Sequence, residues 1–154
     1  MEVFRLSRKK FAHTLSGKGA ALKGARWNSM GVEMIYSAAN RSLAMAEVVV
    51  HLTLGTLPKD YMMITLYIPK FVAVGQIDIA SLPAGWNSFP YLSTTQVVGD
   101  NFISENKFCL LKIPSVVVSG DFNFLINPHH PDFKQIEIRK VVKFPFDNRI
   151  FEGE

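Results

Sequence analysis

The sequence predicts an α+β fold in one domain. Segments with strand-like patterns outnumber helical ones, and only two helices are indicated, both in the first two-thirds of the chain. The repeated strand–helix–strand units of a doubly wound α/β sheet are missing. A length of 154 residues, 48% of them hydrophobic and 12 of them Phe, is enough for one substantial core. We therefore expect residues 1–154 to form a single domain.

The first third of the chain is expected to hold two short strands separated by a polar loop. Residues 2–6 alternate apolar and polar side chains, which is typical of a half-buried strand. The stretch that follows, up to Lys23, is polar and contains Gly17 and Gly19, so we expect a loop there. Residues 34–37 are mostly apolar and predict a second short strand.

The first predicted helix follows that strand and runs to about Leu54. Asn40 or Ser37 can cap its N-terminus, and Gly55 is suited to end it. Its apolar side chains recur at spacings of three and four residues, which places them on one face toward the core. They are Leu43, Ala46, Val50 and Leu54.

The second predicted helix runs to about Glu105. Ser93 or Thr94 can cap its N-terminus, and Asn106 is suited to terminate it. A turn is expected before this helix at residues 83–85, whose sequence is Pro-Ala-Gly.

The rest of the chain is dominated by short apolar or alternating segments, which predict strands. Pro69 separates the first two of them. The predicted strands cover residues 61–68, 72–77, 108–113, 115–118, 123–126 and 136–144.

The net charge of the chain is mildly positive, at +4, from 17 Lys and Arg against 13 Asp and Glu. Basic residues gather in residues 5–23 and again in 134–143. Such segments suit nucleic acid, an acidic partner or a phosphate-bearing ligand. Solvated lysines on strand edges, where they block unwanted strand pairing, explain the same pattern.

No apolar run approaches the roughly 20 residues that a membrane-spanning helix needs, and no secretion signal is recognised, so we expect no membrane partner. Cys109 is the single cysteine, which excludes an internal disulfide framework. A lone thiol between Phe108 and Leu110 is typical of a buried strand residue and suits a reducing, cytoplasmic location. The sequence leaves open whether Gly153-Glu154 belongs to the natural chain.

Four residues point to chemistry: Arg26, Tyr36, Glu47 and Ser115. Glu47 interrupts an apolar stretch and lies four residues after Leu43, at or beside the buried face of the helix. A carboxylate in that position is costly unless it is paired or lies in a cleft. Together, a fixed cation, an aromatic ring, a carboxylate and a hydroxyl can hold a dinucleotide and break its glycosidic bond. Taken singly, each has an ordinary structural explanation.

These residues lie in segments that resemble the RES domain, a family named for an Arg, a Glu and a Ser. The segments are Gly24-Ala25-Arg26-Trp27-Asn28, the strand with Tyr36, the helix with Glu47, Ile113-Pro114-Ser115, and Asn123-Phe124-Leu125-Ile126-Asn127-Pro128-His129-His130-Pro131-Asp132-Phe133. The last run is similar to the family signature Asn-x-Leu-x-Asn-Pro-x-His-Pro. The resemblance covers about residues 4–151. It departs from the family pattern at Ala25, Ile113 and Phe124, where Gly, Val and Tyr are common.

The resemblance implies a fold related to ADP-ribosyltransferases and diphtheria toxin, with a split β-sheet core and flanking helices. It implies NAD as the substrate, without a further cofactor, and three activities: hydrolysis, phosphorolysis with phosphate as co-substrate, or ADP-ribosylation of a protein. RES domains are the toxins of RES–Xre toxin–antitoxin pairs, so the implied partner is an Xre-type helix-turn-helix antitoxin. DNA would be contacted only through that antitoxin, and a homodimer is expected because such antitoxins bind DNA as dimers.

The resemblance and the chemistry of the bond assign roles to the candidate residues. Cleavage between nicotinamide and ribose leaves positive charge on C1′ and the ring oxygen, which Glu47 is expected to stabilise. Arg26 suits the pyrophosphate because its planar fork donates two parallel hydrogen bonds. Tyr36 is expected to stack on the nicotinamide or ribose, and Ser115 to hydrogen-bond the ribose or the carboxamide. Weaker candidates for polar contacts to NAD are Asn28 and Asn123.

Other functions find less support in the sequence. The four histidines form no His-Glu-x-x-His zinc motif, and the helical pair Glu47 and His51 is a weak metal site, so we expect no metal. No Gly-x-Gly-x-x-Gly or Walker loop is present, so NAD would not bind in a Rossmann manner. A non-catalytic basic module that binds nucleic acid or an acidic partner stays open as the competing class.

Overall fold

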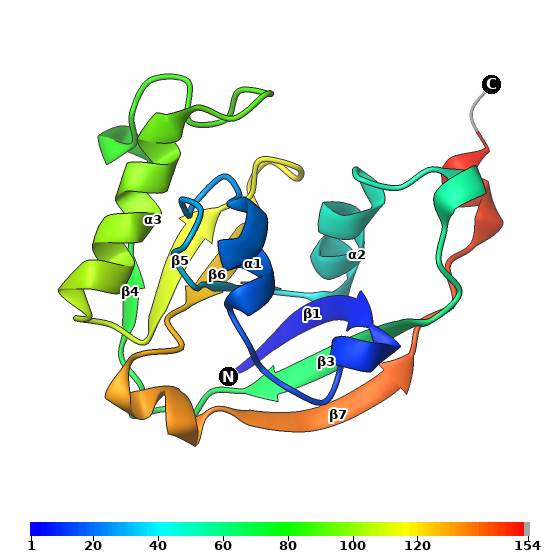
Figure 1. The fold of residues 1–154 in the computed structure, drawn as a ribbon, viewed down its shortest axis with the longest axis horizontal. Coiled ribbons are helices and arrows are strands. Elements are labelled where there is room, and N and C mark those ends of the chain that lie inside the picture. The colour runs from blue at the N-terminus through cyan, green and yellow to red at the C-terminus, as the bar shows by residue number, and fades with distance from the viewer. Residues whose placement is uncertain (153–154) are drawn as a thin grey trace.

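Seven strands form one mixed sheet in residues 1–152, which are the residues that the computed structural model describes (Figure 1). Gly153-Glu154 lies outside the described residues. The sheet order is β4-β5-β6-β2-β1-β3-β7, in which only the β4–β5 pair is parallel. The strands are β1 (Glu2–Arg8), β2 (Ile35–Ala38), β3 (Tyr61–Tyr67), β4 (Val74–Gln76), β5 (Leu110–Pro114), β6 (Phe122–Ile126) and β7 (Glu137–Lys143). The α-helices are α1 (Lys18–Lys23), α2 (Arg41–Val49) and α3 (Ser93–Glu105).

One face of the sheet carries two separate helix contacts. The register pairs Phe4 with Ala38, Ala38 with Asn123, and Asn123 with Ile113. Paired side chains on neighbouring strands point to the same face of a sheet. On this face α2 packs near Phe4 and Ala38, whereas α3 packs near Ile113. In Figure 1, α3 lies to the left of β5 and β6 and α2 lies to their right, over the same face of the sheet. Asn123 therefore lies on the stretch of this face between the two helices.

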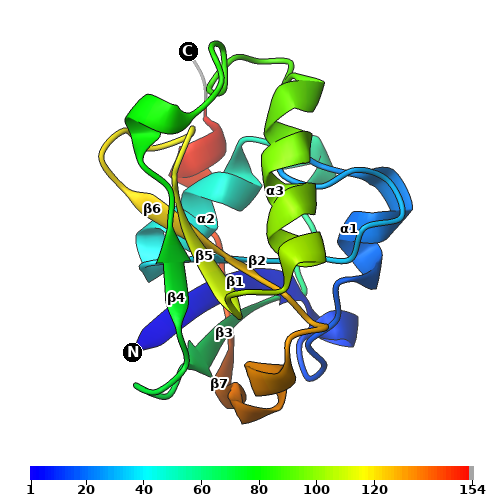
Figure 2. The same ribbon diagram turned by 90° about the vertical axis from the view of Figure 1, so that its left-hand side faces the viewer.

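The other face of the sheet holds a second part of the core. Figure 2 shows β4 and β5 running steeply across the direction of β1 and β3, so the sheet is strongly twisted. Segments outside the sheet, with Ala12, Leu15 and Phe133, cover this face. Its buried strand residues are Val3, Ile35, Ile64, Leu66, Leu110, Phe124 and Ile126.

The predicted α+β class is confirmed, together with most of its elements. Helix α2 starts at a predicted cap, because the Asn40 side chain accepts a hydrogen bond from the Leu43 N–H at 2.8 Å. Helix α3 ends at Asn106, whose φ of 52° is the left-handed conformation that often terminates a helix. Cys109 is fully buried, as its apolar neighbours predicted.

The helix limits differ from the prediction at three places. Residues 18–23, predicted as loop, form α1; none of them is buried, so the sequence shows no apolar periodicity there. Helix α2 ends at Val49 instead of Leu54, and Val50 is exposed. Helix α3 begins without a side-chain cap after Leu92, so neither predicted serine or threonine cap is used. No helix within residues 1–152 is long and apolar enough to cross a membrane.

The strand predicted at residues 115–118 is wrong, and its absence shapes the site. The Ser115 hydroxyl accepts hydrogen bonds from the N–H groups of Val117 and Val118, at 3.1 and 3.0 Å. A hydroxyl that binds backbone N–H groups two and three residues ahead closes a local turn. The chain therefore bends directly after β5, although three valines follow Ser115.

Candidate active site

Glu47 is the centre of a polar cluster on the sheet face between α2 and α3. Its Oε1 atom accepts a hydrogen bond from the Ser115 hydroxyl at 2.8 Å and another from the Asn123 Nδ2 at 2.5 Å. The three residues come from α2, the end of β5 and β6, so the fold brings them together over 68 and 76 residues of sequence separation. The carboxylate is thus held in one orientation. No partner of its Oε2 atom occurs among the hydrogen bonds of residues 1–152.

The Ser115 hydroxyl is fully committed within this cluster. It donates its single hydrogen to Glu47 and accepts from the two N–H groups of the bend that follows β5. The side chain is 4% exposed. Its one donor is therefore used within the protein, where it fixes the position of Glu47 instead of making the expected contact to ribose or carboxamide.

Tyr36 lies on the same face, in β2, two residues before Ala38. Its hydroxyl donates to Asn28 Oδ1 at 2.7 Å and accepts from the Trp27 N–H at 3.2 Å. Burial raises the pKa of Tyr36, so the phenol is neutral over the physiological range. These bonds attach the ring of Tyr36 to the segment that carries Arg26.

Asn28 is fully buried, and its amide is used inside the protein. Its Nδ2 donates to the carbonyl oxygens of Ala20 and Val32, at 3.0 and 3.1 Å, while its Oδ1 accepts from Tyr36. The predicted contact between Asn28 and NAD therefore has no free donor to make it. The geometry favours a positioning role for Asn28 instead, which the residue type alone did not indicate.

Arg26 lies between α3 and the site and is bound to the loop before α3. Its Nη1 donates to the carbonyl oxygens of Trp86 and Ser88, both at 2.9 Å. Its Cζ lies over the Tyr91 ring, 5.9 Å from the centroid. Partial burial lowers the pKa of Arg26, and the negative charge of Glu47 acts in the opposite direction. Nε and Nη2 have no hydrogen-bond partner among the described residues, so these donors are available to an anion.

Helix α3 holds the Arg26 segment in place through contacts that sequence reasoning missed. The Thr95 hydroxyl donates to the Arg26 carbonyl oxygen at 2.7 Å, and Gln96 Nε2 donates to the Ala25 carbonyl oxygen at 3.0 Å. A Cβ at Gly99 would lie 1.6 Å from the Trp27 carbonyl oxygen, so only glycine allows this approach. Polar residues at a helix start are usually solvated, so their pattern held no signal of these contacts.

The predicted site residues are therefore brought to one face, in two connected groups. Glu47, Ser115 and Asn123 contact one another directly. Tyr36 and the Arg26 segment form the second group, joined by the bond from the Trp27 N–H to the Tyr36 hydroxyl, and the charge of Glu47 affects the pKa of Arg26. Among the described residues no group of three or more His, Cys, Asp or Glu side chains could hold a metal ion.

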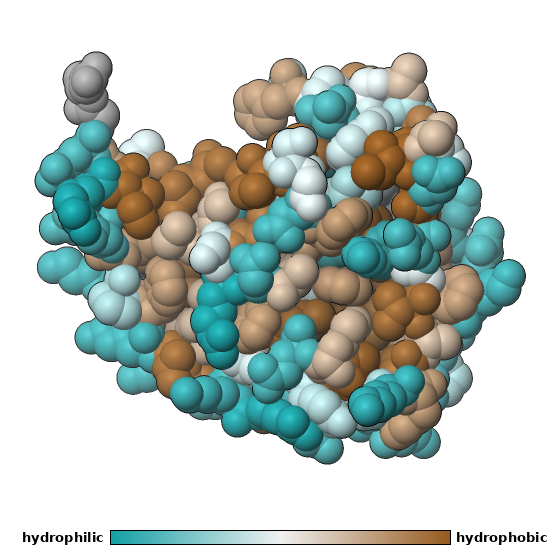
Figure 3. All heavy atoms as spheres, turned by 180° about the vertical axis from the view of Figure 1, so that it is seen from behind, coloured by the Kyte–Doolittle hydropathy of each residue, from teal (hydrophilic) through white to brown (hydrophobic). Residues whose placement is uncertain are grey.

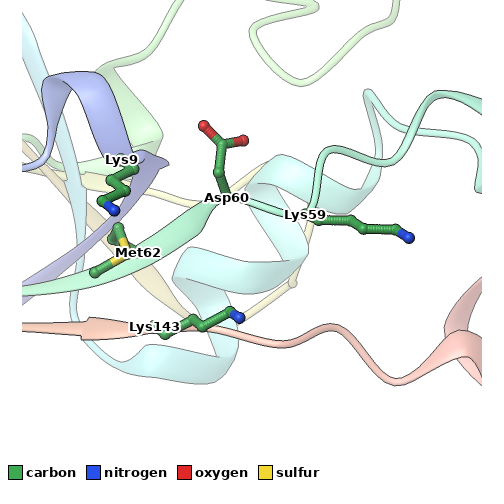
Figure 4. A pocket seen from close by; sticks show the side chains of 5 residues that line it. All are labelled: Lys9, Lys59, Asp60, Met62 and Lys143. Atoms are coloured by element: carbon green, nitrogen blue, oxygen red, sulfur yellow. The ribbon is translucent and has the colours of Figure 1, made fainter.

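Two surface hollows lie elsewhere, near the ends of β1, β3 and β7. Figure 4 shows one of them, which Lys9, Lys59, Asp60, Met62 and Lys143 line. The second shares Lys59 and Lys143 with it. Asp60 is paired with Arg8, whose hydrogen bond lowers the pKa of the carboxyl. Neither hollow contains a residue of the Glu47 cluster.

The molecular outline is also hollowed above α2, the helix that carries Glu47. Figure 3 shows a notch above α2, between the side with the C-terminal segment and the side with the loop before α3. Apolar side chains form much of its floor. The notch is open to a ligand or a partner from above α2.

The fold and the cluster define an α+β protein in which a serine at the end of β5 and an asparagine of β6 hold one carboxylate of α2. The family model described as "RES domain" matches residues 2–147, and the chain belongs to this family. The "Prs ADP-ribosylating toxin" of Sphingobium sp. strain YBL2 is 39% identical over 142 residues, which cover 90% of this chain and 88% of the relative. A "Toxin Res" of Photorhabdus laumondii is 32% identical over 100% of this chain and 99% of the relative.

A solved structure has the same fold. It is the toxin–antitoxin complex MbcT-MbcA of M. tuberculosis, with a TM-score of 0.74 over 93% of this chain and 83% of the matched chain. The sequence identity is 20%, so this likeness concerns the fold.

Proposed function

We propose that this chain is the toxin of a toxin–antitoxin pair and that it cleaves NAD at the bond between nicotinamide and ribose. Membership of the RES family and the names of the two relatives support the toxin part of the proposal. The observation that carries the chemical part is the Glu47 carboxylate, which Ser115 and Asn123 hold through one oxygen only. The second oxygen is left for the hydroxyls of a ribose.

In this mechanism Glu47 stabilises charge that develops as the glycosidic bond breaks. The electron pair of the bond between C1′ and the nicotinamide nitrogen leaves with nicotinamide. The ribose becomes oxocarbenium-like, with positive charge on C1′ and the ring oxygen. A fixed carboxylate next to that charge needs no reorganisation during the reaction and can contribute about 3 kcal/mol or more.

The remaining residues position NAD relative to Glu47. The free Nε and Nη2 donors of Arg26 suit two oxygens of the pyrophosphate. The ring of Tyr36, which its hydroxyl ties to the Arg26 segment, suits a stacking contact with the nicotinamide half. Asn123 and Ser115 keep Glu47 in place.

Two kinds of acceptor fit the same first step. Water or phosphate that attacks C1′ would give hydrolysis or phosphorolysis, and both would deplete NAD and arrest growth. A protein side chain that attacks C1′ would instead become ADP-ribosylated. The name of the Sphingobium relative, an ADP-ribosylating toxin, favours this second activity as the alternative.

The proposal includes a protein partner that controls the site. The structural neighbour was solved as a toxin–antitoxin complex, and a toxin that depletes NAD must be restrained in its own cell. An Xre-type helix-turn-helix antitoxin that covers the notch above α2 would block access to Glu47. DNA is then bound by the antitoxin, and two antitoxin-bound copies would form a dimer. A cytoplasmic location follows from the NAD substrate.

The experiment is the release of nicotinamide from NAD by the purified chain without its antitoxin, with and without phosphate, beside a Glu47→Ala variant. We expect release by the wild type that falls by about 10²-fold or more in the variant. ADP-ribose or its phosphate as the second product separates hydrolysis from phosphorolysis. Transfer of label from NAD to a protein in cell extract identifies the transferase. A chain that neither releases nicotinamide nor labels protein would be a binding module instead.

A further inference from the structure

The loop between β4 and α3 presents aromatic rings next to Arg26. It contains a turn at Gly85, whose φ is +76°, and the Ser88 hydroxyl donates to the Gly85 carbonyl oxygen at 2.7 Å. Phe89 is 86% exposed and Tyr91 is 41% exposed. The exposed parts of these rings are accessible to a ligand or partner, and an aromatic ring can stack on a flat group.

Arg26 holds this loop and positions Tyr91. Its Nη1 donates to the carbonyl oxygens of Trp86 and Ser88, which precede Tyr91 by five and three residues. These two bonds attach the loop to the Arg26 segment close to Tyr91. The guanidinium also lies over the Tyr91 ring at 5.9 Å, within the range of a cation–π contact. One face of the ring is therefore next to Arg26. The exposed remainder of the ring is free to stack on a flat group.

The relative places of Glu47 and this loop set the direction of a bound dinucleotide. Glu47 belongs to α2, whereas the loop leads into α3, and β5 and β6 lie between the two helices in Figure 1. Arg26 contacts the loop through hydrogen bonds, and the Tyr36 hydroxyl joins its segment to β2. Strand β2 pairs with β6, whose Asn123 binds Glu47, so these contacts place Arg26 between the loop and the Glu47 side of the sheet. If the nicotinamide ribose is at Glu47 and the pyrophosphate at Arg26, the adenosine half extends toward Tyr91.

We propose that Tyr91 stacks on the adenine ring of NAD and is thereby a specificity residue for dinucleotides. This inference rests on the proposed cleavage of NAD, because it takes the direction of the substrate from Glu47. Stacking of a base on an aromatic side chain contributes to binding affinity, and replacing the side chain by alanine measures this contribution. Nicotinamide mononucleotide has the same scissile bond and lacks adenine, so it separates the two halves of the site.

The experiment compares wild type, Tyr91→Ala, Tyr91→Phe and Phe71→Ala on NAD and on nicotinamide mononucleotide. Phe71 is a matched control because its ring is 68% exposed in the connection between β3 and β4. We expect the KM of Tyr91→Ala for NAD to rise about tenfold or more, with a far smaller change in kcat. The same variant should lose much less on the mononucleotide, and Tyr91→Phe should retain most of the affinity for NAD.

A second measurement separates failure of this inference from failure of the proposed function. Calorimetric titration with ADP-ribose reports binding of the adenosine half without any cleavage. If Tyr91→Ala binds ADP-ribose about tenfold or more weakly than the wild type, the adenine contact stands even when NAD is not cleaved. Equal affinity of the two proteins for ADP-ribose would overturn it. Equal losses of Tyr91→Ala on NAD and the mononucleotide would overturn it as well.

Discussion

Replacing Gly99 by alanine tests how α3 fixes the Arg26 segment. The new Cβ would lie 1.6 Å from the Trp27 carbonyl oxygen and 2.7 Å from its carbonyl carbon. Both are backbone atoms, so no side-chain rotation relieves the overlap and either α3 or the Arg26 segment must shift. Thr95 would then lose its 2.7 Å bond to the Arg26 carbonyl oxygen.

The expected cost of Gly99→Ala follows from this overlap. Overpacking a close contact costs about 1–3 kcal/mol, and we expect about 3 kcal/mol because the contact is with backbone. For a domain of this length each kcal/mol lowers Tm by roughly 2–4 °C, so Tm should fall by roughly 6–12 °C. A shift of Arg26 by about an ångström also misplaces the substrate. The rate of NAD cleavage should therefore fall by roughly 10²-fold, even when it is assayed at a temperature well below the Tm of the variant.

Thermal unfolding followed by circular dichroism measures the first effect, and nicotinamide release measures the second. Gly19→Ala is the matched control, because a Cβ at Gly19 meets no atom within 4 Å and alanine favours helix α1. Its Tm should equal or exceed that of the wild type. A Gly99→Ala variant with the Tm and activity of the wild type would refute the reasoning.

Three further predictions concern the elements around the site. Tyr36→Phe removes the hydroxyl that binds Asn28 and Trp27, so the free energy of unfolding from thermal melts should fall by about 1–3 kcal/mol. NAD cleavage should fall as well, and an unchanged Tm would contradict this role. Asn40→Ala removes the cap of α2 and should lower stability by about 1 kcal/mol in urea unfolding, whereas a loss near zero would show that the cap is dispensable. Burial raises the pKa of Cys109 from 9.0 to about 12, so the unfolded thiol ionises first. The unfolding free energy should therefore fall as pH rises above about 9, by up to about 1.4 kcal/mol per pH unit, and urea unfolding of Cys109→Ala should lack this contribution.

The sequence predicted those elements whose signals are local. Asn40 caps α2 through a bond to a residue three positions ahead, and Asn106 ends α3 through its own backbone conformation. The apolar residues of β1 predicted a strand at the right place, but its burial does not alternate, because the sheet is covered on both faces and Val3 and Phe4 are both buried. Helix α1 has no buried residue, and contacts made by Asn28 help to hold it, so its own sequence shows no helical pattern.

Side-chain partners that are distant in sequence could not be predicted. The valines after Ser115 favour a strand, but the serine hydroxyl binds two N–H groups ahead and ends β5. Glu47 was recognisable as a lone carboxylate in an apolar stretch, yet its bonds to Ser115 and Asn123 depend on how three elements pack. Arg26 was expected to bind phosphate, and its attachment to the loop before α3 has no signal in the residues around it.

The central claim is that the carboxylate charge of Glu47 drives cleavage of NAD, and Glu47→Gln tests it most directly. The amide oxygen of glutamine can still accept from Ser115 and Asn123, so the cluster should keep its geometry while losing its charge. Glu105→Gln removes an exposed carboxylate at the end of α3 and is the control. At saturating NAD, we predict that Glu47→Gln releases nicotinamide about 10²-fold or more slowly than the wild type and Glu105→Gln, with an unchanged Tm. A Glu47→Gln rate within a few fold of the wild type would contradict the account.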